Sequence, residues 1–564
     1  MERRPGSSLR GWVAFGVIPA VYSLMLLLVL RSPTRGEYGG ALLAGLSLAF
    51  SAAAMWVGRP SARRLLDIAA RPARAWGGAP VGWAALLTFL LCAAVAKFVL
   101  EAFPISADEL AYIFQARTYA EGRLWADAPP LAAAVQFPHI FDLHGMWVSQ
   151  YLPGWPIVLA PAAALRAPLW LVNPVIAAAT VVTFFVLARR YVGRETAWIG
   201  VALLVGSAFF LMTYGSYFNH GFTTLAGVAF ALFGSRYWRD GRARDALLAG
   251  ICLGAMGLTR PQNAATFAAP FVVFLLLAKD RRKGLLWFVL GGAPFLAALL
   301  AYDAVITGDP LRPVQTVMVR EPVGVPGWRG VKRAIQRLLR LPEWTSPILL
   351  FGWAAAFLLA LKRRQADFTD WIMPVTFVAL LFYGGQGGPQ FGSRYFFEAW
   401  PFAILTTLKI IEPLLKDSSR PGQASWIASG ALAAVALQLA YMPPRMLREH
   451  QIVEEQREPY RAVAAAGLKH ALVLFADDNG GRFRQPFPAD FLRNGPHVER
   501  QNVIYALDLG LKNNELLAAY PGRAVYIWEN GALSPLNGAI SSPGRPAPAP
   551  LTTPALKASP ILGF

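Results

Sequence analysis

The sequence has few cysteines and few charged residues, and both shortages restrict the class of protein it can be. Its 564 residues include two cysteines, Cys92 and Cys252, and each lies in an apolar run. A disulfide framework or a cysteine-rich metal site is therefore not indicated. Charged residues make up 15% of the chain, whereas a soluble chain would carry about a quarter. This composition argues against a soluble protein.

Motifs for nucleotide-driven chemistry are also missing. The sequence contains no glycine-rich phosphate loop, no Walker pattern and no nucleophile elbow, so ATP is not expected as an energy source within this chain. The net charge of +20 does not indicate nucleic acid, because basic clusters in loops between apolar runs account for most of this excess charge. In such loops they set the orientation of membrane helices.

Long apolar runs are what the sequence offers instead. A helix that crosses a bilayer needs about 20 mainly apolar residues, and the first run, although preceded by arginines, is too long for a cleaved signal. We expect an all-α polytopic membrane protein with about thirteen transmembrane helices. The expected spans are residues 12–30, 39–57, 81–100, 168–188, 197–213, 221–235, 246–258, 264–278, 285–304, 346–361, 371–385, 397–411 and 424–441. The shorter apolar run 155–166 predicts a re-entrant or interfacial helix.

Basic clusters between these spans predict the orientation. They comprise Arg59, Arg63, Arg64, Arg71 and Arg74; Arg189, Arg190 and Arg194; Arg236, Arg239, Arg242 and Arg244; Lys279, Arg281, Arg282 and Lys283; and Lys362, Arg363 and Arg364. With the expected spans, all of these clusters fall on one side, which the positive-inside rule makes cytoplasmic. We therefore expect an inner or plasma membrane protein with a cytoplasmic N-terminus and an extracytoplasmic C-terminal subdomain.

The domain organisation follows from the same pattern. Residues 1–441 are expected to form the transmembrane domain, with a large outer loop at 101–154. Residues 442–537 are mixed and polar, and predict a small outer α/β subdomain with strands at 471–476, 502–510 and 524–530 and a helix that ends at Gly522. The tail 538–564 is rich in proline and alanine and is expected to be disordered.

The outer loop carries an acidic pair at a predicted helix start. Ser106 is followed three residues later by Glu109, the spacing of a capping box. On the helix that follows, Asp108, Tyr112 and Gln115 share one face, which Tyr119 extends. Both acids would suit the positive end of a helix dipole, and for Glu109 this explanation is sufficient. Asp108 lies on the polar-aromatic face and is a candidate general base.

Arginines on the predicted outer side form a second group of candidates. Arg260 precedes Pro261, and Arg394 lies beside Tyr395, with Glu398 one turn further and expected to pair with it. The loop between the ninth and tenth spans is also basic, with Arg320, Arg329, Lys332 and Arg333. Guanidinium groups bind phosphate in a bidentate manner, so these residues could hold a lipid phosphate. Contact with lipid headgroups is the alternative for Arg333, Arg337 and Arg340.

Two histidine-containing segments complete the outer side. His139, Asp142 and His144 suggest a metal site, but their spacing is loose and no third strong ligand is near, so a divalent metal is not supported. Asn219 and His220 lie in an outer turn, where a satisfied polar turn and a substrate contact both fit.

Four segments together resemble the membrane glycosyltransferases of the C-type fold. They are SADELAYIFQARTYAEGRLW, SQYLPGWPIVLAP, GLTRPQNA and FGSRYFFEAWP, within residues 95–410. The sequence is most similar to bacterial relatives of the dolichyl-phosphate-mannose protein mannosyltransferases and of the lipid A aminoarabinose transferase. The resemblance differs at Asn219–His220, where many relatives have a second acid, and in the number of spans before the acidic loop, where a single one is usual.

The resemblance implies a reaction and a set of site residues. A sugar, hexose or pentose, would move from a polyprenyl-phosphate donor to a lipid, glycan or protein acceptor on the outer face, with inversion and without a nucleotide or ATP. Asp108 would act as base or position the acceptor, with Glu109 as the second catalytic candidate. The residues expected to bind substrate or lipid phosphate are Tyr112, Gln115, Tyr151, Asn219, His220, Arg260, Arg394, Tyr395 and Glu398.

Two functions of other classes compete with this one. A transporter or flippase for a lipid-linked substrate should have internal repeats and broken helices with polar groups near the bilayer midplane. The sequence has no clear repeat, and its polar residues gather on one side. A scaffold protein would leave the Asp108 face and the outer arginines unexplained.

Overall fold

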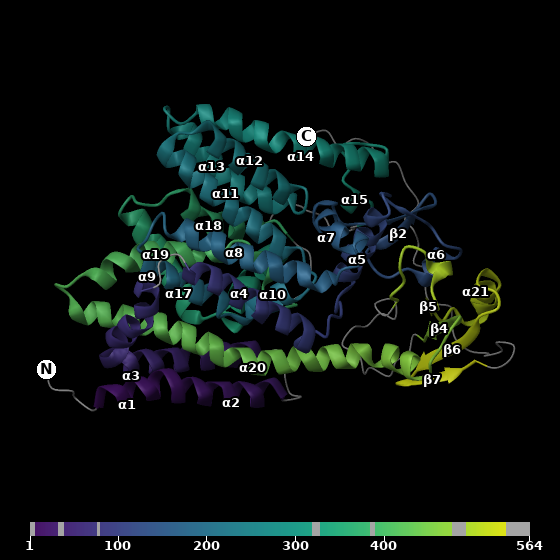
Figure 1. Ribbon diagram of the computed structural model, residues 1–564, viewed down its shortest axis with the longest axis horizontal. Coiled ribbons are helices and arrows are strands. Elements are labelled where there is room, and N and C mark those ends of the chain that lie inside the picture. Colours follow the sequence, from purple (N-terminus) through teal and green to yellow (C-terminus); the bar gives the residue numbers. More distant parts are fainter. Residues whose placement is uncertain are drawn as a thin grey trace. The chain divides into compact units, whose positions relative to one another are not determined.

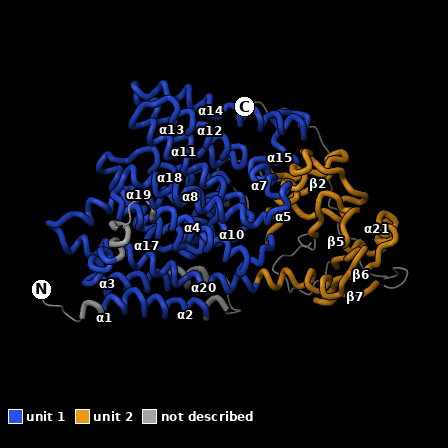
Figure 2. Tube along the Cα trace, in the orientation of Figure 1, with its two compact units in different colours: residues 1–104, 152–451 blue, residues 105–151, 452–564 orange. Residues whose placement is uncertain are grey.

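The computed structural model describes residues 6–31, 39–75, 79–318, 327–383, 390–476 and 492–536. The chain divides into two compact units, coloured separately in Figure 2. Unit 1 comprises Met1–Pro104 and Leu152–Gln451, and unit 2 comprises Ile105–Tyr151 and Ile452–Phe564. The sequence-predicted tail 538–564, Arg320 and the glycine-rich turn 384–389 lie outside the described residues.

Unit 1 is built from helices, as Figure 1 shows. Apolar residues dominate them, and a helix satisfies its backbone polar groups internally, as a bilayer requires. The helices are α1 Gly6–Trp12, a π-helical turn Val13–Val17, α2 Ile18–Arg31, α3 Gly39–Ala75, α4 Ala79–Ala94, a second π-helical turn Val95–Val99, α7 Gly154–Ala164, α8 Val172–Ala188, α9 Arg194–Val205, α10 Ala208–Gly215, α11 His220–Asp240, α12 Ala243–Gly257, α13 Pro261–Leu277, α14 Lys283–Thr307, α15 Val314–Met318, α16 Trp328–Arg340, α17 Pro347–Lys362, α18 Phe368–Leu381, α19 Trp400–Lys416 and α20 Pro421–Ala465.

Among the described residues, five helical segments are long and apolar enough to cross a membrane. They are Leu9–Leu27, Pro80–Val99, Leu169–Ala188, Lys283–Thr307 and Pro421–Ala465. Other apolar helices, such as α13, α17 and α18, have 14 to 17 residues. At 1.5 Å per residue they are about 21–25 Å long, less than a hydrocarbon core of about 30 Å. The predicted number of about thirteen transmembrane helices is therefore not confirmed.

The expected span 197–213 is a bent pair of helices. Helices α9 and α10 meet at an angle of 62° at Gly206 and Ser207. A Cβ atom at Gly206 would lie 2.5 Å from the carbonyl oxygen of Ala202, so only glycine fits there. Ser207 then caps α10, because its side chain accepts a hydrogen bond from the Phe210 amide. If the bent pair is taken as one span, the described residues contain six candidate spans instead of five.

Aromatic packing holds the centre of unit 1 together. The Phe230 ring on α11 contacts Phe271 at a centroid distance of 5.4 Å and Phe368 at 6.0 Å. Helices α12 and α14 approach closely, since a Cβ atom at Gly250 would lie 2.0 Å from the carbonyl oxygen of Phe288. These contacts fix α11, and the N-terminus of α11 carries two of the predicted site residues.

Unit 2 combines two small sheets with helices. Its elements are α5 Ala107–Ala120, β1 Ala126–Asp127, α6 Ala132–Val135, β2 Ile140–Leu143, β3 Met146–Ser149, β4 Ala471–Phe475, β5 Val503–Leu507, α21 Asn513–Ala519, β6 Ala524–Glu529 and β7 Ala532–Pro535. The first sheet has the antiparallel order β1-β3-β2, and the second has the order β5-β4-β6-β7. Strand β4 is parallel to both neighbours, with Ala471 opposite Val503 and Ala524. The three predicted strands are confirmed, and β7 adds an antiparallel edge.

Two distant parts of the sequence share the core of unit 2. The Tyr520 hydroxyl donates to the carbonyl oxygen of Pro130 at 2.8 Å, and the Asn494 side chain donates to that of Val135 at 2.7 Å. Burial raises the pKa of Tyr520. Trp147 and Phe475 are buried in the same apolar cluster. Residues 105–151, expected as an outer loop, therefore fold together with the C-terminal strands, and α20 continues past residue 441, where the subdomain was expected to begin.

Candidate functional site

The predicted capping box at the start of α5 is confirmed. The Ser106 hydroxyl accepts from the Glu109 amide at 3.3 Å, and Glu109 Oε2 accepts from the amides of Ser106 at 3.1 Å and Ile105 at 2.9 Å. Glu109 is 1% exposed. Its carboxylate is thus engaged by the backbone that begins the helix, which is a structural task.

Asp108, the neighbouring acid, contacts two side chains from the hairpin that follows α5. The Tyr151 hydroxyl donates a short hydrogen bond to Asp108 Oδ1. His139 Nε2 lies 3.1 Å from the same oxygen. The Asp108 side chain remains 13% exposed and that of His139 32%. Asp108 is therefore a partly accessible carboxylate whose orientation is fixed by the Tyr151 hydroxyl and the neighbouring His139 ring.

The polar-aromatic face of α5 gathers around Tyr151. The Tyr112 and Tyr151 rings have centroids 4.7 Å apart. Gln115 Nε2 donates to the Tyr119 hydroxyl at 2.7 Å and to the Tyr151 carbonyl oxygen at 3.2 Å. The predicted face of Asp108, Tyr112, Gln115 and Tyr119 is thus assembled by one residue, Tyr151, that lies just beyond β3.

The three residues that suggested a metal have different surroundings. His139 contacts Asp108, as described above. Asp142 Oδ1 accepts a hydrogen bond from the Gly145 amide at 2.7 Å in the exposed turn between β2 and β3. His144 lies in that turn with a positive φ of 53°. Asp142 therefore stabilises a hairpin turn, and His139 acts with Asp108.

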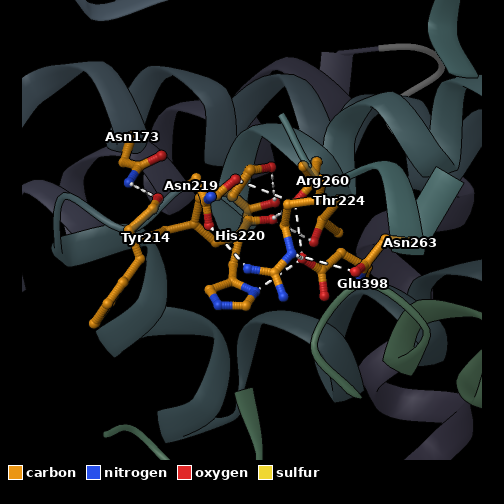
Figure 3. A network of polar contacts seen from close by, with 11 residues as sticks. Asn173, Tyr214, Asn219, His220, Thr224, Arg260, Asn263 and Glu398 are labelled. Carbon is orange, nitrogen blue, oxygen red and sulfur yellow. Dashed lines mark hydrogen bonds and ion pairs between the residues drawn. The ribbon is translucent and has the colours of Figure 1, made fainter. Parts of the chain in front are cut away.

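A second polar cluster lies inside unit 1, at the N-terminus of α11 (Figure 3). His220 Nδ1 lies 2.8 Å from Glu398 Oε1, and the Thr223 hydroxyl donates to that oxygen at 2.8 Å. Arg260 Nε is 3.4 Å from it. Glu398 is 0% exposed and His220 1% exposed. A buried carboxylate is costly unless it is paired and hydrogen-bonded, and here it has three partners.

Polar side chains support this cluster from neighbouring helices. Arg260 donates to the side-chain oxygens of Asn219 at 3.4 Å and Asn263 at 3.3 Å. Asn173 on α8 donates to the carbonyl oxygens of Ser216 at 2.7 Å and Phe218 at 2.9 Å, and so fixes the turn before His220. Figure 3 shows Asn219, Asn263 and Glu398 around the Arg260 side chain. The guanidinium group is thereby held in one orientation.

The predicted pairing of Glu398 with Arg394 is wrong, because Glu398 pairs with His220 and Arg260. Arg394 lies in a 3₁₀ turn, Arg394–Phe396, before α19 begins at Trp400. One-turn spacing on a continuous helix therefore does not apply to these two residues. The Arg394 guanidinium instead lies over the Phe218 ring at 4.9 Å and the Tyr395 ring at 5.8 Å.

Three guanidinium groups surround the Tyr395 ring. Besides Arg394, Arg337 lies 5.1 Å and Arg260 5.6 Å from the ring centroid. Arg337 is 9% exposed, on the inner side of the basic amphipathic helix α16. Gly392, two residues before Arg394, lies against Trp344, because a Cβ atom there would be 2.6 Å from the ring, and its φ is +94°. Guanidinium groups that stack on an aromatic ring can also form charge-assisted hydrogen bonds to an anion that binds beside them.

Sequence reasoning missed several members of this arrangement. Arg337 was singled out only for its place in a basic helix, with headgroup contact as an alternative. Thr223 and Asn263 follow His220 and Arg260 by three residues, one helical turn, and this spacing could have indicated them. The described structure therefore contains one cluster in each unit: Asp108 with Tyr151 and His139 in unit 2, and the arginines with His220 and Glu398 in unit 1.

Comparison with known proteins supports the resemblance. The family model described as dolichyl-phosphate-mannose-protein mannosyltransferase matches residues 163–302. No curated protein matches the sequence. The crystal structure of ArnT from Cupriavidus metallidurans bound to undecaprenyl phosphate has 12% identity and a TM-score of 0.50, covering 79% of this chain and 93% of that one. This similarity shows a shared fold.

A second solved structure is less similar. The archaeal oligosaccharyltransferase AglB from Archaeoglobus fulgidus, in complex with an inhibitory peptide and a dolichol-phosphate, has 12% identity and a TM-score of 0.42. It covers 75% of this chain and 64% of that one. The resemblance to C-type membrane glycosyltransferases, predicted from four sequence segments, is confirmed by the family match and by the fold shared with ArnT.

Proposed function

We propose, for a chain that resembles the dolichyl-phosphate-mannose-protein mannosyltransferases, that it is an integral membrane glycosyltransferase. The donor is a sugar linked to a polyprenyl phosphate, and the acceptor is a lipid, glycan or protein on the extracytoplasmic face. The family match over residues 163–302 and the fold shared with ArnT, whose structure contains undecaprenyl phosphate, support a donor of this kind.

The observation that carries the proposal is the cluster of Arg260, Arg337 and Arg394 around Tyr395. Three cations inside an apolar helical unit need an anion or aromatic rings to lie against. Glu398 pairs with Arg260, and rings contact all three guanidinium groups. The phosphate of a lipid carrier fits this environment, since arginine binds phosphate oxygens through two parallel hydrogen bonds.

The same cations would assist the reaction itself. When the bond between the sugar's anomeric carbon and the phosphate oxygen breaks, its electron pair stays on that oxygen and negative charge develops there. Guanidinium groups already in position stabilise this charge without rearrangement. Arg260 is held in one orientation by Asn219 and Asn263. The leaving group is the polyprenyl phosphate, and no nucleotide is consumed.

Asp108 is proposed as the base or the group that positions the acceptor. The acceptor's hydroxyl or amine would give its proton to the Asp108 carboxylate as its oxygen or nitrogen bonds to the anomeric carbon. Attack opposite the departing phosphate inverts the configuration at that carbon. The Tyr151 hydroxyl donates to Asp108 Oδ1, and His139 Nε2 lies 3.1 Å from the same oxygen, so that the carboxylate has a fixed direction. No metal is required in this scheme.

The experiment is transfer of radiolabelled sugar from polyprenyl-phosphate donors in proteoliposomes. Wild type is compared with Asp108→Asn and with the control Asp142→Asn, whose carboxylate lies in an exposed turn of the same unit. Transfer that collapses in Asp108→Asn and persists in the control supports both the enzyme and the base. Equal transfer by all three removes Asp108 from the mechanism.

One observation favours a transporter or flippase as the second candidate. The break between α9 and α10, bent by 62°, is the kind of interrupted helix that transporters use. The two functions differ in what happens to the donor. An enzyme cleaves it, whereas a flippase moves it intact between leaflets, so unchanged donor recovered from the opposite leaflet would favour the second candidate.

A further inference from the structure

A large groove in unit 1 shares no lining residue with either cluster described above. Its volume is about 1340 Å³, above the roughly 300–1,000 Å³ of pockets for drug-sized ligands. Its walls come from α2, α3, α9, the end of α19 and α20. The membrane-spanning segments that contribute, Leu9–Leu27 and Pro421–Ala465, are only 28% and 44% buried. These segments therefore present much of their apolar surface to the bilayer, where lipid is the surrounding solvent.

One wall of the groove is a continuous apolar stripe along α20. It runs from Ala428 to Ala440 at steps of four residues, through Leu432 and Ala436. Twelve residues of helix rise about 18 Å. One leaflet of a hydrocarbon core about 30 Å thick measures about 15 Å, so the stripe matches the length of an acyl chain in a single leaflet. Because alanine side chains are small, they leave room for an acyl chain beside the helix.

The other end of the groove is charged. Along α9, the lining changes from Arg194 and Glu195 to Trp198 and then Ala202. Helix α19 contributes Glu412 and Lys416, which pair at 2.7 Å, and Glu412 also accepts from the Gly193 amide at 2.6 Å. Arg63 and Asp67 on α3 complete this end. The groove thus has the polarity of a lipid molecule, with a charged end and an apolar length.

The charged end is balanced, with three cations and three carboxylates. The cations are Arg63, Arg194 and Lys416, and the carboxylates are Asp67, Glu195 and Glu412. A headgroup with only negative charge would lie beside these carboxylates and would have no positive group to pair with them. A headgroup with both a phosphate and an ammonium group can contact each kind of side chain. A primary ammonium also donates N–H hydrogen bonds to carboxylates, which a choline group cannot do.

We propose that this groove binds a zwitterionic phospholipid with a primary amine headgroup. The phosphate lies toward Arg63 and Arg194, the ammonium toward Asp67 and Glu195, and one acyl chain lies along the α20 stripe. Arg63 and Arg194 belong to clusters predicted to be cytoplasmic, so the lipid comes from the cytoplasmic leaflet. This site is independent of the proposed sugar transfer and of the arginines around Tyr395.

The test is native mass spectrometry of the full chain, delipidated and then offered equal amounts of palmitoyl-oleoyl phosphatidylethanolamine, phosphatidylglycerol and phosphatidylcholine. We expect wild type to retain phosphatidylethanolamine preferentially. Arg63→Ala and Glu195→Gln should each reduce this retention about tenfold, because each removes a charge-assisted hydrogen bond. The matched control is Arg64→Ala, the exposed neighbour on α3 that does not line the groove, which should retain the lipid like wild type.

A separate variant tests the apolar length without altering the charges. Ala436→Trp places a large ring in the stripe and should abolish retention, while circular dichroism and size-exclusion profiles stay like those of wild type. Equal retention of the three lipids by wild type would overturn the proposal, and so would a preference for phosphatidylglycerol. Undiminished phosphatidylethanolamine retention by Arg63→Ala, Glu195→Gln and Ala436→Trp would overturn it as well.

Discussion

The His220 ring and the Glu398 carboxylate, 178 residues apart in the sequence, meet at 2.8 Å inside unit 1. Both side chains are almost fully buried, and the same carboxylate oxygen also lies 3.4 Å from Arg260 Nε. This relationship joins the start of α11, the start of α13 and the segment before α19. Glu398 is therefore the group that holds the Arg260 region of the arginine cluster together.

Removing the Glu398 carboxylate should destabilise the protein. Glu398→Ala leaves Arg260 buried without its carboxylate, a change that costs about 3–5 kcal/mol when one partner of a buried pair is lost. Glu398→Gln keeps the shape and the Thr223 hydrogen bond, and should fold with a smaller loss of stability. Thermal unfolding in detergent measures both, with Asp240→Asn as a control on the exposed end of α11. A Glu398→Ala protein as stable as wild type would contradict this account.

The arginines around Tyr395 should bind the carrier phosphate through their planar geometry. Arg394→Lys and Arg337→Lys keep the charge but lose the bidentate contact and the stacking, so each should weaken binding of undecaprenyl phosphate about tenfold. Binding is measured by fluorescence competition in nanodiscs. Arg340→Lys is the matched control, since Arg340 is exposed on the same helix as Arg337. Equal affinity in all three variants would leave the cluster a purely structural role.

Tyr151 should matter for activity through its hydrogen bond to Asp108. Tyr151→Phe keeps the ring contact with Tyr112 but removes the donor, so transfer should fall by about tenfold to a hundredfold with donor binding unchanged. His139→Gln removes the second contact of the same oxygen and should have a smaller effect. Tyr526→Phe, on β6 of the same unit, controls for the loss of a hydroxyl. Full activity in Tyr151→Phe would mean that Asp108 needs no such donor.

The two acids at the start of α5 should have different roles, with Glu109 acting in the helix cap and Asp108 in sugar transfer. Ser106→Ala removes the cap and should cost about 0.5–2 kcal/mol of stability while transfer continues. Glu109→Gln should keep both stability and transfer, because glutamine also completes a capping box. Comparison with Asp108→Asn in the same transfer assay makes the distinction. Loss of transfer in a stable Glu109→Gln protein would instead give Glu109 a part in the reaction.

Local features of both clusters could be predicted from the sequence. The capping box at Ser106 and the face of Asp108, Tyr112 and Gln115 follow from helical spacing alone, and both are present. The strands β4, β5 and β6 were also predictable, because each is a short run of β-forming residues between polar segments. Such features depend on neighbours within a turn or two of the chain.

Long-range features could not be predicted in this way. His139 reaches Asp108 because β2 pairs with β3, and no spacing rule connects these two residues. Glu398 was assigned to Arg394 because they are one turn apart, but the 3₁₀ turn between them ends before α19 begins. The number of spans is not confirmed, because apolarity alone does not separate a full crossing from a shorter apolar helix of 14 to 17 residues.

The most direct measurement of the central claim follows the donor lipid itself. Proteoliposomes are loaded with polyprenyl-phosphate sugar and an acceptor, and mass spectrometry counts free polyprenyl phosphate and glycosylated acceptor over time. The account predicts that the two products appear in equal amounts with wild type, and that neither appears with Asp108→Asn. Intact donor that moves between leaflets, with no polyprenyl phosphate released by wild type for any sugar, would contradict it.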